Sequence, residues 1–266
     1  MAVILNIETS AQMCSVALSE DGAVVYKLSE QEGMNHAKAL APFVDECIRY
    51  AEDRNMALDA VAVSIGPGSY TGLRIGLSTA KGICFAKNIP LIGVSTLKIM
   101  AVSAMFKSYD WEGDEILVPM LDARRMEAFT AVYDFALNAI IEPHAKIFDS
   151  ESFSDLLQDK KVFFMGNCCE KVQEVIKSPN AKFMHGIVPN ATDMLALSEK
   201  AFRNNDFLDL AYSVPEYLKE YQNYTLTSFH CEHSVIECDK FFLIARIAIT
   251  VNEDDTANTN EQQVSS

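Results

Sequence analysis

One stretch of the sequence decides the fold: Gly66-Pro-Gly-Ser-Tyr-Thr-Gly-Leu-Arg-Ile-Gly-Leu-Ser-Thr-Ala-Lys-Gly82. It holds five of the protein's eleven glycines and directly follows the apolar segment 61–65. Because glycine tolerates positive φ and proline fixes its own φ, a strand that runs into Gly-Pro-Gly must turn sharply. Gly72, Gly76 and Ala80 then recur every four residues, on one face of a helix. The stretch therefore predicts a strand, a tight loop and a helix with one flat face.

A loop that leads into a helix can bind phosphate, because the first amides of the helix point outward and carry partial positive charge. The spacing is not the Walker pattern, since no Gly-Lys-Ser/Thr ends the loop and Lys81 lies far along the helix. It is not a good dinucleotide fingerprint either. The stretch alone leaves two interpretations open, a phosphate loop and a helix face for close packing.

Composition indicates a globular, acidic protein. The chain has 266 residues, 49% of them hydrophobic, enough for one large domain or two smaller ones with their own cores. Lys and Arg number 22 against 37 Asp and Glu, so the formal net charge is −15. Such a chain repels nucleic-acid phosphates and anionic membranes, and a basic protein is its more natural partner.

The sequence shows no targeting or membrane signal. The strand-like run 3–7 begins the chain, without the basic region and apolar core of a signal peptide. The longest apolar segment, 241–251, is too short to span a membrane and contains Arg246. Seven scattered cysteines fit reduced thiols in a cytosolic protein. We therefore expect a cytoplasmic protein that does not enter the membrane.

Residues 1–108 show a three-strand meander followed by alternating helices and strands. Apolar alternation, with Asp21-Gly22 as a hairpin turn, predicts strands at 3–7, 15–18 and 23–26. Apolar periodicity then predicts helices over 35–52, 72–87 and 95–106, separated by strands at 59–65 and 90–94. This order implies a mixed sheet with helices packed on it.

The same order returns beyond the polar boundary 107–114, within residues 109–221. Strands are predicted at 115–121, 126–136, 139–148 and 161–165, and helices at 151–158, 168–177 and 190–204. Two units that each open with a meander indicate a duplicated α/β fold. Residues 222–266 form an atypical acidic tail that cannot support a core, and we expect it to be partly disordered, with a strand conceivable at 241–251.

Three segments carry a family resemblance: Ile7-Glu-Thr-Ser10, the glycine stretch 66–82, and Leu121-Asp-Ala-Arg124. Together they resemble the TsaB (YeaZ-type) family, subunits of the bacterial machinery that makes threonylcarbamoyladenosine in tRNA. The resemblance covers about residues 1–221 and implies two RNase H-like subdomains of the actin, sugar-kinase and Hsp70 ATPase superfamily, the second degraded. It also implies a non-catalytic subunit that activates TsaD, works with a TsaE-like ATPase and meets tRNA only through that complex.

The resemblance implies that the metal centre is absent. In the catalytic relative TsaD, a His-Leu-Glu-Gly-His type motif follows the glycine segment, and its histidines lie four residues apart on one helix face. Here Thr96 and Met100 stand at the two histidine positions, and Lys98 replaces the acidic residue. A lysine there repels a divalent cation. We expect neither a metal nor catalysis supported by one.

Nucleotide binding in the superfamily needs two phosphate-cradling turns, and the second, 121–127, contains no glycine here. We expect no cofactor, and nucleotide only at an interface with a partner. The remnant of a phosphate loop comprises Glu8, Thr9, Ser10, Gly66, Gly68, Ser69 and Gly72. Glu8 and Asp122 form either a carboxylate pair for acid–base chemistry or, as we favour, acceptors for loop amides and for Arg124 or Arg125.

Two other groups have side chains suited to chemistry. His36 opens the first helix, and we expect it to face solvent or cap the helix beside Asn35, because a catalytic role needs a Ser or Cys partner nearby. His230, Cys231 and His233 are zinc-ligand types, but their spacing matches no common structural zinc pattern. We expect an irregular tail there.

The small-residue face packs either on the protein's own sheet or on another protein. In the TsaB family the first two helices pair with the same surface of TsaD or of a second TsaB copy, as a symmetric dimer requires. The resemblance implies these interface residues: Ala39, Phe43, Leu73, Gly76, Leu77 and Ala80. It predicts that Gly76→Arg abolishes association and leaves the monomer folded. The alternative functions are an ATP-dependent, kinase-like enzyme of small molecules and a metallopeptidase.

Overall fold

The computed structural model describes residues 2–30, 36–107 and 111–219. Residues 1–220 form one compact unit. The elements of its first half are β1 (Val3–Glu8), β2 (Cys14–Glu20), β3 (Ala23–Glu30), α1 (His36–Glu52), β4 (Ala60–Gly66), α2 (Tyr70–Lys87), β5 (Leu91–Ser95) and α3 (Thr96–Lys107). They agree with the predicted ranges to within a few residues. Among the described helices, none is both long and apolar enough to cross a membrane.

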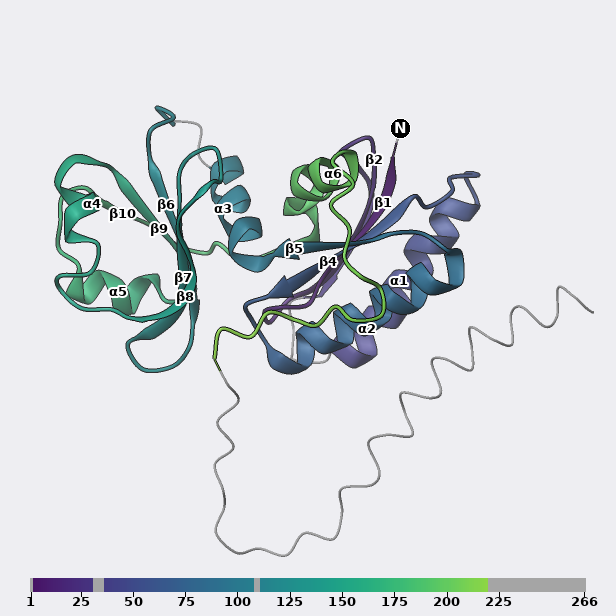
Figure 1. The fold of residues 1–266 in the computed structure, drawn as a ribbon, viewed down its shortest axis with the longest axis horizontal. Coiled ribbons are helices and arrows are strands. Elements are labelled where there is room, and N and C mark those ends of the chain that lie inside the picture. The colour runs from purple at the N-terminus through teal and green to yellow at the C-terminus, as the bar shows by residue number, and fades with distance from the viewer. Residues whose placement is uncertain (1, 31–35, 108–110, 220–266) are drawn as a thin grey trace, which may run out of the picture. The chain divides into compact units, whose positions relative to one another are not determined.

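The first sheet has the strand order β3-β2-β1-β4-β5 (Figure 1). Strands β1, β2 and β3 are antiparallel neighbours, whereas β4 runs parallel to both β1 and β5. Helices α1 and α2 cover one face, where Leu40, Val44 and Leu77 pack on strand residues such as Leu5 and Val61. The glycine stretch thus begins at the end of β4 and continues as α2, as predicted.

The second sheet repeats this topology. Its elements are β6 (Ile116–Asp122), β7 (Glu127–Tyr133), β8 (Ala139–Ile147), α4 (Ser154–Asp159), β9 (Val162–Gly166), α5 (Cys169–Val175) and β10 (Ala181–Met184). The strand order β8-β7-β6-β9-β10 matches that of the first sheet strand for strand. Antiparallel pairing of β6, β7 and β8 is again followed by parallel pairing of β6, β9 and β10. The repeated order confirms the duplicated α/β fold.

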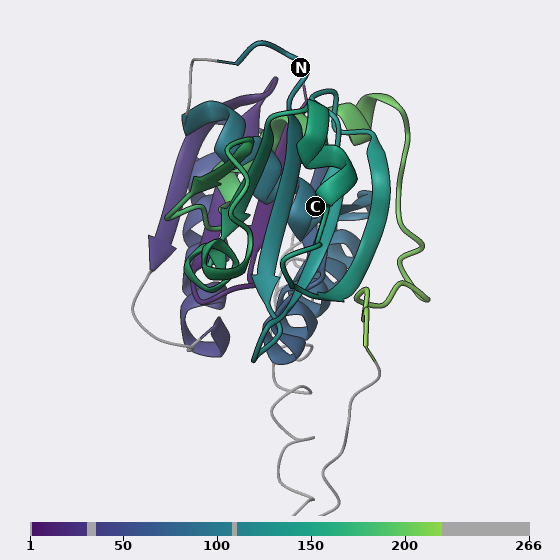
Figure 2. The ribbon, with the colours of Figure 1, turned by 90° about the vertical axis from the view of Figure 1, so that its left-hand side faces the viewer.

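The copies differ in their helices rather than in their strands. Helices α4 and α5 have six and seven residues, against 17 and 18 for α1 and α2. Helix α3 covers the other face of the second sheet, where Leu97, Met100 and Ala104 pack with Leu117 and Tyr133. Figure 2 views the molecule from the side of this second sheet. The second copy is therefore reduced in its helices and complete in its sheet.

Two predicted elements need correction. The predicted helix 190–204 is divided into η1 (Ala191–Asp193) and α6 (Leu195–Arg203), and strand β10 was not predicted. β10 has only four residues, too few for a periodic signal. Three predictions lie outside the described residues: the cap at Asn35, the acidic tail 222–266 and the cluster at 230–233.

Helix α6 returns to the first sheet although it follows the second sheet in sequence. Ser198 Oγ donates a hydrogen bond of 2.7 Å to Asn6 Oδ1 of β1, and both residues are fully buried. Ala191 N donates to Ser15 Oγ of β2 at 3.0 Å. A buried polar pair of this kind costs stability when one partner is removed, so it fixes where the returning chain docks.

After α6 the chain runs along α2 in an irregular segment with a turn at 210–212; we call this segment, residues 208–217, the strap (Figure 1). Leu208 N bonds to Leu91 O at 2.8 Å, and Glu216 N bonds to Ile65 O at 2.7 Å. A Cβ at Gly66 would lie 2.7 Å from Glu216 O, so the side-chain-free backbone there makes room for the strap.

The glycine face of α2 packs on the loop after β1. A Cβ at Gly72 would lie 2.1 Å from the Thr9 carbonyl oxygen, and one at Gly76 would lie 2.3 Å from Thr9 Oγ1. Thr9 Oγ1 also donates to Gly72 O at 2.8 Å. These distances confirm the packing interpretation of the small-residue face.

Alanine substitutions in α2 test this close contact. We expect Gly72→Ala to lower the free energy of unfolding by about 1–3 kcal/mol, because the new methyl group meets backbone. Gly82→Ala is the matched control, since a Cβ there meets nothing within 4 Å; we expect a gain of up to about 1 kcal/mol from helix propensity. Urea unfolding of both variants checks this, and equal midpoints would contradict it.

Candidate functional site

A cleft of about 250 Å³ opens between the loop after β1 and the carboxyl end of β6. Its lining includes Ser10, Ala11, Gln12, His36, Gly68, Ser69, Leu121, Asp122, Phe129 and Asn167. It thus joins the start of α2 to the equivalent turn of the second sheet. This is where the sequence places the two halves of a phosphate site.

Glu8, at the end of β1, is fully buried and is bonded to Ser10 of the cleft lining. Its Oε1 accepts hydrogen bonds from the Ser10 amide and from Ser10 Oγ, both at 2.5 Å. Its Oε2 has no partner among the described residues. Burial raises the pKa of Glu8 to about 7, although the bonds from Ser10 and Ser64 oppose the rise. Glu8 therefore accepts from the Ser10 loop amide, as we favoured.

The backbone amides of the first turn donate hydrogen bonds within the protein. Ser69 N donates to Ser10 O at 2.7 Å, and the Gly72 amide donates to Ser69 Oγ at 3.2 Å as the N-cap bond of α2. A Cβ at Gly68 would lie 2.4 Å from Ser10 O. The structure thus brings the predicted loop residues together, but it uses their amides within the protein. Phosphate binding requires such amides to be free.

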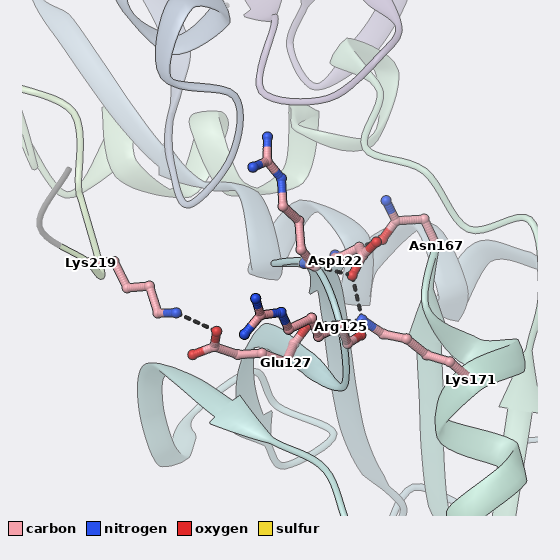
Figure 3. A network of polar contacts seen from close by, with 7 residues as sticks. Asp122, Arg125, Glu127, Asn167, Lys171 and Lys219 are labelled. Atoms are coloured by element: carbon pink, nitrogen blue, oxygen red, sulfur yellow. Dashed lines mark hydrogen bonds and ion pairs between the residues drawn. The ribbon is translucent and has the colours of Figure 1, made fainter. Parts of the chain in front are cut away.

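The second turn is organised by Lys171 of α5 (Figure 3). Its ammonium forms a short ion pair with Asp122 Oδ1 and donates to the carbonyl oxygens of Arg125 and Glu127 at 2.7 and 2.9 Å. Asn167 Oδ1 accepts from the Asp122 amide at 2.9 Å. A cation therefore sits inside this turn and holds it together.

The turn residues Arg124 and Arg125 adopt positive φ, 74° and 52°, where glycine is the usual residue. Arg124 contributes its backbone amide to Asp122 Oδ1 at 3.0 Å, and not its guanidinium. Asp122 thus accepts from a loop amide, as we favoured, but its ion pair is with Lys171 and not with the guanidinium of Arg124 or Arg125. The sequence gives no signal for Lys171 here, since three strands and α4 separate α5 from the turn along the chain.

His36 is the site residue that the sequence placed wrongly. It is only 5% exposed, and its Nδ1 has no partner among the described residues. Its ring lies against α2, since a Cβ at Gly72 would be 3.2 Å from His36 Cδ2. We expected a solvent-facing or capping side chain, but the missing side chain at Gly72 opens the space that the ring fills.

The positions expected to lack metal ligands belong to the core. Thr96 and Met100 are fully buried on α3, and the Met100 side chain packs against Gly166. Elsewhere in the described residues, Glu112, Asp114 and Glu115 bring ligand atoms within 4.8 Å of one another. Glu115 accepts from two backbone amides and Glu112 pairs with Lys161 at 2.5 Å, so the two glutamates already have partners.

The structure corrects the predicted interface. Five of its six residues are buried inside the chain: Ala39, Leu73, Gly76, Leu77 and Ala80. Only Phe43 is half-buried, and it packs against the core of the first sheet. The expectation that Gly76→Arg leaves the monomer folded is also wrong on this geometry, because Gly76 touches Thr9. Periodicity identified a smooth face, but that face turns inward.

Comparisons with known proteins agree with this geometry. Residues 27–234 match the family described as TsaD: tRNA N6-adenosine threonylcarbamoyltransferase. The chain is 29% identical over 224 residues to the tRNA threonylcarbamoyladenosine biosynthesis protein TsaB of Escherichia coli (strain K12), covering 81% of this chain and 94% of that protein. It is 27% identical to the protein of the same name from Bacillus subtilis (strain 168), covering 81% and 93%.

Among solved structures, the chain is similar to YeaZ from Pseudomonas aeruginosa, with a TM-score of 0.69 and 25% identity. That similarity covers 82% of this chain and 100% of the other. The duplicated sheets, the resemblance of the glycine stretch and the family match therefore agree. The chain belongs to the tRNA N6-adenosine threonylcarbamoyltransferase (TsaD) family, and within it to the TsaB/YeaZ type.

Proposed function

We propose that the chain works in tRNA threonylcarbamoyladenosine biosynthesis as a non-catalytic, TsaB-type subunit. In the cytoplasm it would bind and activate a TsaD-like catalytic subunit, act with a TsaE-like ATPase, and meet tRNA only through the complex. The observation that carries this proposal is the match to a TsaB protein over 94% of that protein's length. The fold and the occupied turns of the cleft support it.

The site chemistry favours contact over catalysis. In the first turn the Ser69 amide already donates to a carbonyl within the protein, and in the second turn Lys171 donates to two carbonyls. The cleft therefore offers few free donors for phosphate. Cys14, Cys47, Cys84, Cys168 and Cys169 are all buried, and burial raises the pKa of each thiol. Buried thiols with raised pKa values are poor nucleophiles.

The outer faces of α1 and α2 are better suited to docking than the buried stripe. Helices α1 and α2 pack beside each other. Among the exposed or half-buried residues of these two helices, several have small or apolar side chains. We define the docking face by these exposed or half-buried residues: Ala37, Ala41, Ile75, Ser78 and Gly82.

A partner helix can approach small residues closely. If this chain binds one conformational state of TsaD more tightly than another, its binding shifts TsaD toward that state. The docking face also suits a second copy of this chain, because one patch can meet itself across a two-fold axis. We propose a homodimer as the form that the subunit takes without its partner. Pairing with TsaD would then replace one copy by the related subunit.

Gly82→Arg tests the docking face. A Cβ at Gly82 meets nothing within 4 Å, and arginine has a higher helix propensity than glycine, so the monomer should stay folded. We expect the arginine side chain to block the close approach and lower co-purification of the TsaD-like subunit at least tenfold. Affinity capture followed by sizing measures this.

Gln158→Arg is the matched control, because it adds the same charge at an exposed site on α4. We expect it to capture the partner like the unchanged chain. Normal capture by Gly82→Arg would refute the docking face. Equal loss in both variants would attribute the effect to charge and refute it as well.

One observation favours the alternative of an ATP-dependent enzyme: Glu8 is a buried carboxyl with a strongly raised pKa beside a cleft. Such groups often act as general acids or bases. In our proposal Glu8 is instead a structural acceptor for Ser10. No such observation among the described residues favours a metallopeptidase, and their carboxylate group at 112–115 already has partners.

Glu8→Gln separates the two. The pKa of Glu8 rises from an ordinary value near 4.5 to about 7 on folding, so the folded state holds the proton more tightly. The associated stability is present below pH 4.5 and is lost as pH rises toward 7, by on the order of 3 kcal/mol. We expect Glu8→Gln to remove this loss. Urea unfolding should therefore show the free energy of unfolding of Glu8→Gln rising relative to that of the unchanged chain between pH 4.5 and 8.

The exposed Glu174→Gln is the control and should follow the unchanged chain at every pH. Identical pH dependence of Glu8→Gln and the unchanged chain would contradict the buried acid. The enzyme alternative predicts that the isolated chain turns over Mg-ATP and that Glu8→Gln abolishes the turnover. That result would overturn the non-catalytic role.

A further inference from the structure

The end of the strap runs from one wall of the cleft to the other. The glycine loop forms the first wall, and the turn after β6 forms the second. The Glu216 amide donates to Ile65 O at 2.7 Å, one residue before the glycine stretch begins. Three residues later, Lys219 forms an ion pair with Glu127, at the end of the second turn (Figure 3). Residues 216–219, which we call the latch, therefore join the two walls.

Several contacts anchor the first end of the latch. A Cβ at Gly66 would lie 2.7 Å from Glu216 O, so the chain lies directly against the backbone of the glycine stretch. Arg74 Nε donates to Tyr217 Oη at 3.0 Å, and the Tyr217 ring packs on Tyr70 of α2 with the ring centroids 5.1 Å apart. The latch can leave the first wall only if these contacts break together.

The second end of the latch depends on one ion pair. The side chains of Lys219 and Glu127 are 47% and 21% exposed, so water reaches the pair in part. Within the described residues, Lys219 forms no other ion pair or side-chain hydrogen bond. A pair that is accessible to water shifts an equilibrium only about two- to fivefold. This end can therefore open while the first end stays in place.

The length of the latch limits how far the two walls can separate. The chain passes from the first sheet to the second after β5, and it returns to the first sheet after β10. Rotation of one sheet and its helices about these two connections would widen the cleft, as in a hinge motion. Because three residues extend over at most about 11 Å, a closed latch opposes this rotation.

We propose that residues 216–219 hold the cleft closed, and that the cleft opens when the ion pair between Lys219 and Glu127 breaks. The anchored end then remains on the first wall, and Lys219 moves away from the second. The balance between closed and open clefts depends on salt, because ions screen a pair that water reaches. The proposal does not depend on the proposed function.

The other cations labelled in Figure 3 cannot take the place of Lys219. Lys171 already forms an ion pair with Asp122, and it donates to the backbone carbonyl of Glu127 at 2.9 Å. Arg125 belongs to the same turn as Glu127. An ion pair that either of them formed with Glu127 would stay within the second wall. Of these three cations, only Lys219 comes from the first wall's side of the latch.

The distance between spin labels on the two walls tests the proposal. Thr71→Cys on α2 and Glu170→Cys on α5 carry the labels at exposed positions, in a full chain with Cys231→Ser and Cys238→Ser. The other five thiols are buried. We expect Lys219→Gln to raise the share of longer separations about two- to fivefold. Sodium chloride at about 1 M should do the same without that substitution, since the Debye length is then only about 3 Å.

Glu127→Gln should open the cleft equally, and the double variant Lys219→Gln, Glu127→Gln no further, because both changes remove one pair. Lys182→Gln is the matched control: it removes the same charge from an exposed lysine that bonds to Pro179 O, and it should leave the separations unchanged. Unchanged separations in Lys219→Gln or at high salt would overturn the proposal. Equal opening in Lys182→Gln, or additive effects of the two single changes, would overturn it as well.

Discussion

The structure depends on one close contact, between the glycine face of α2 and the loop that follows β1. Thr9 occupies the space that side chains at Gly72 and Gly76 would fill, and its hydroxyl bonds to the helix backbone. Because this contact holds α2 on the sheet, it also positions the buried Ser10–Glu8 pair and the ring of His36. Close packing at one junction therefore sets the geometry of the side of the cleft that the first sheet supplies.

The same contact underlies our proposal that this cleft does not serve as a phosphate site. Glycine at a loop–helix junction leaves amides accessible, but here Ser10 and Ser69 bind those groups within the protein. On the opposite side of the cleft, the Lys171 ammonium supplies the positive charge that a bound cation or a helix end would otherwise supply. It forms an ion pair with Asp122 and donates hydrogen bonds to two backbone carbonyls. Both turns are stabilised by hydrogen bonds within the protein.

Sequence reasoning succeeded where the signal is local and failed where it depends on a neighbour. Periodicity showed that α2 has a smooth face, and it could not show that the face meets Thr9 rather than a partner. It likewise missed the burial of His36, which exists because Gly72 leaves room for the ring. Lys171 was missed for a similar reason, since only the pairing of β6 with β9 brings α5 beside the turn at 123–126.

The sequence by itself determined the order of elements, the duplication of the α/β unit and the family resemblance. These follow from local patterns of glycine, proline and apolar residues, which act over a few residues of chain. Only the tertiary structure decided which helix faces are buried, which cation serves Asp122 and where α6 returns to bond Asn6. Those outcomes depend on side chains far apart in sequence that meet only when the two sheets and their helices pack.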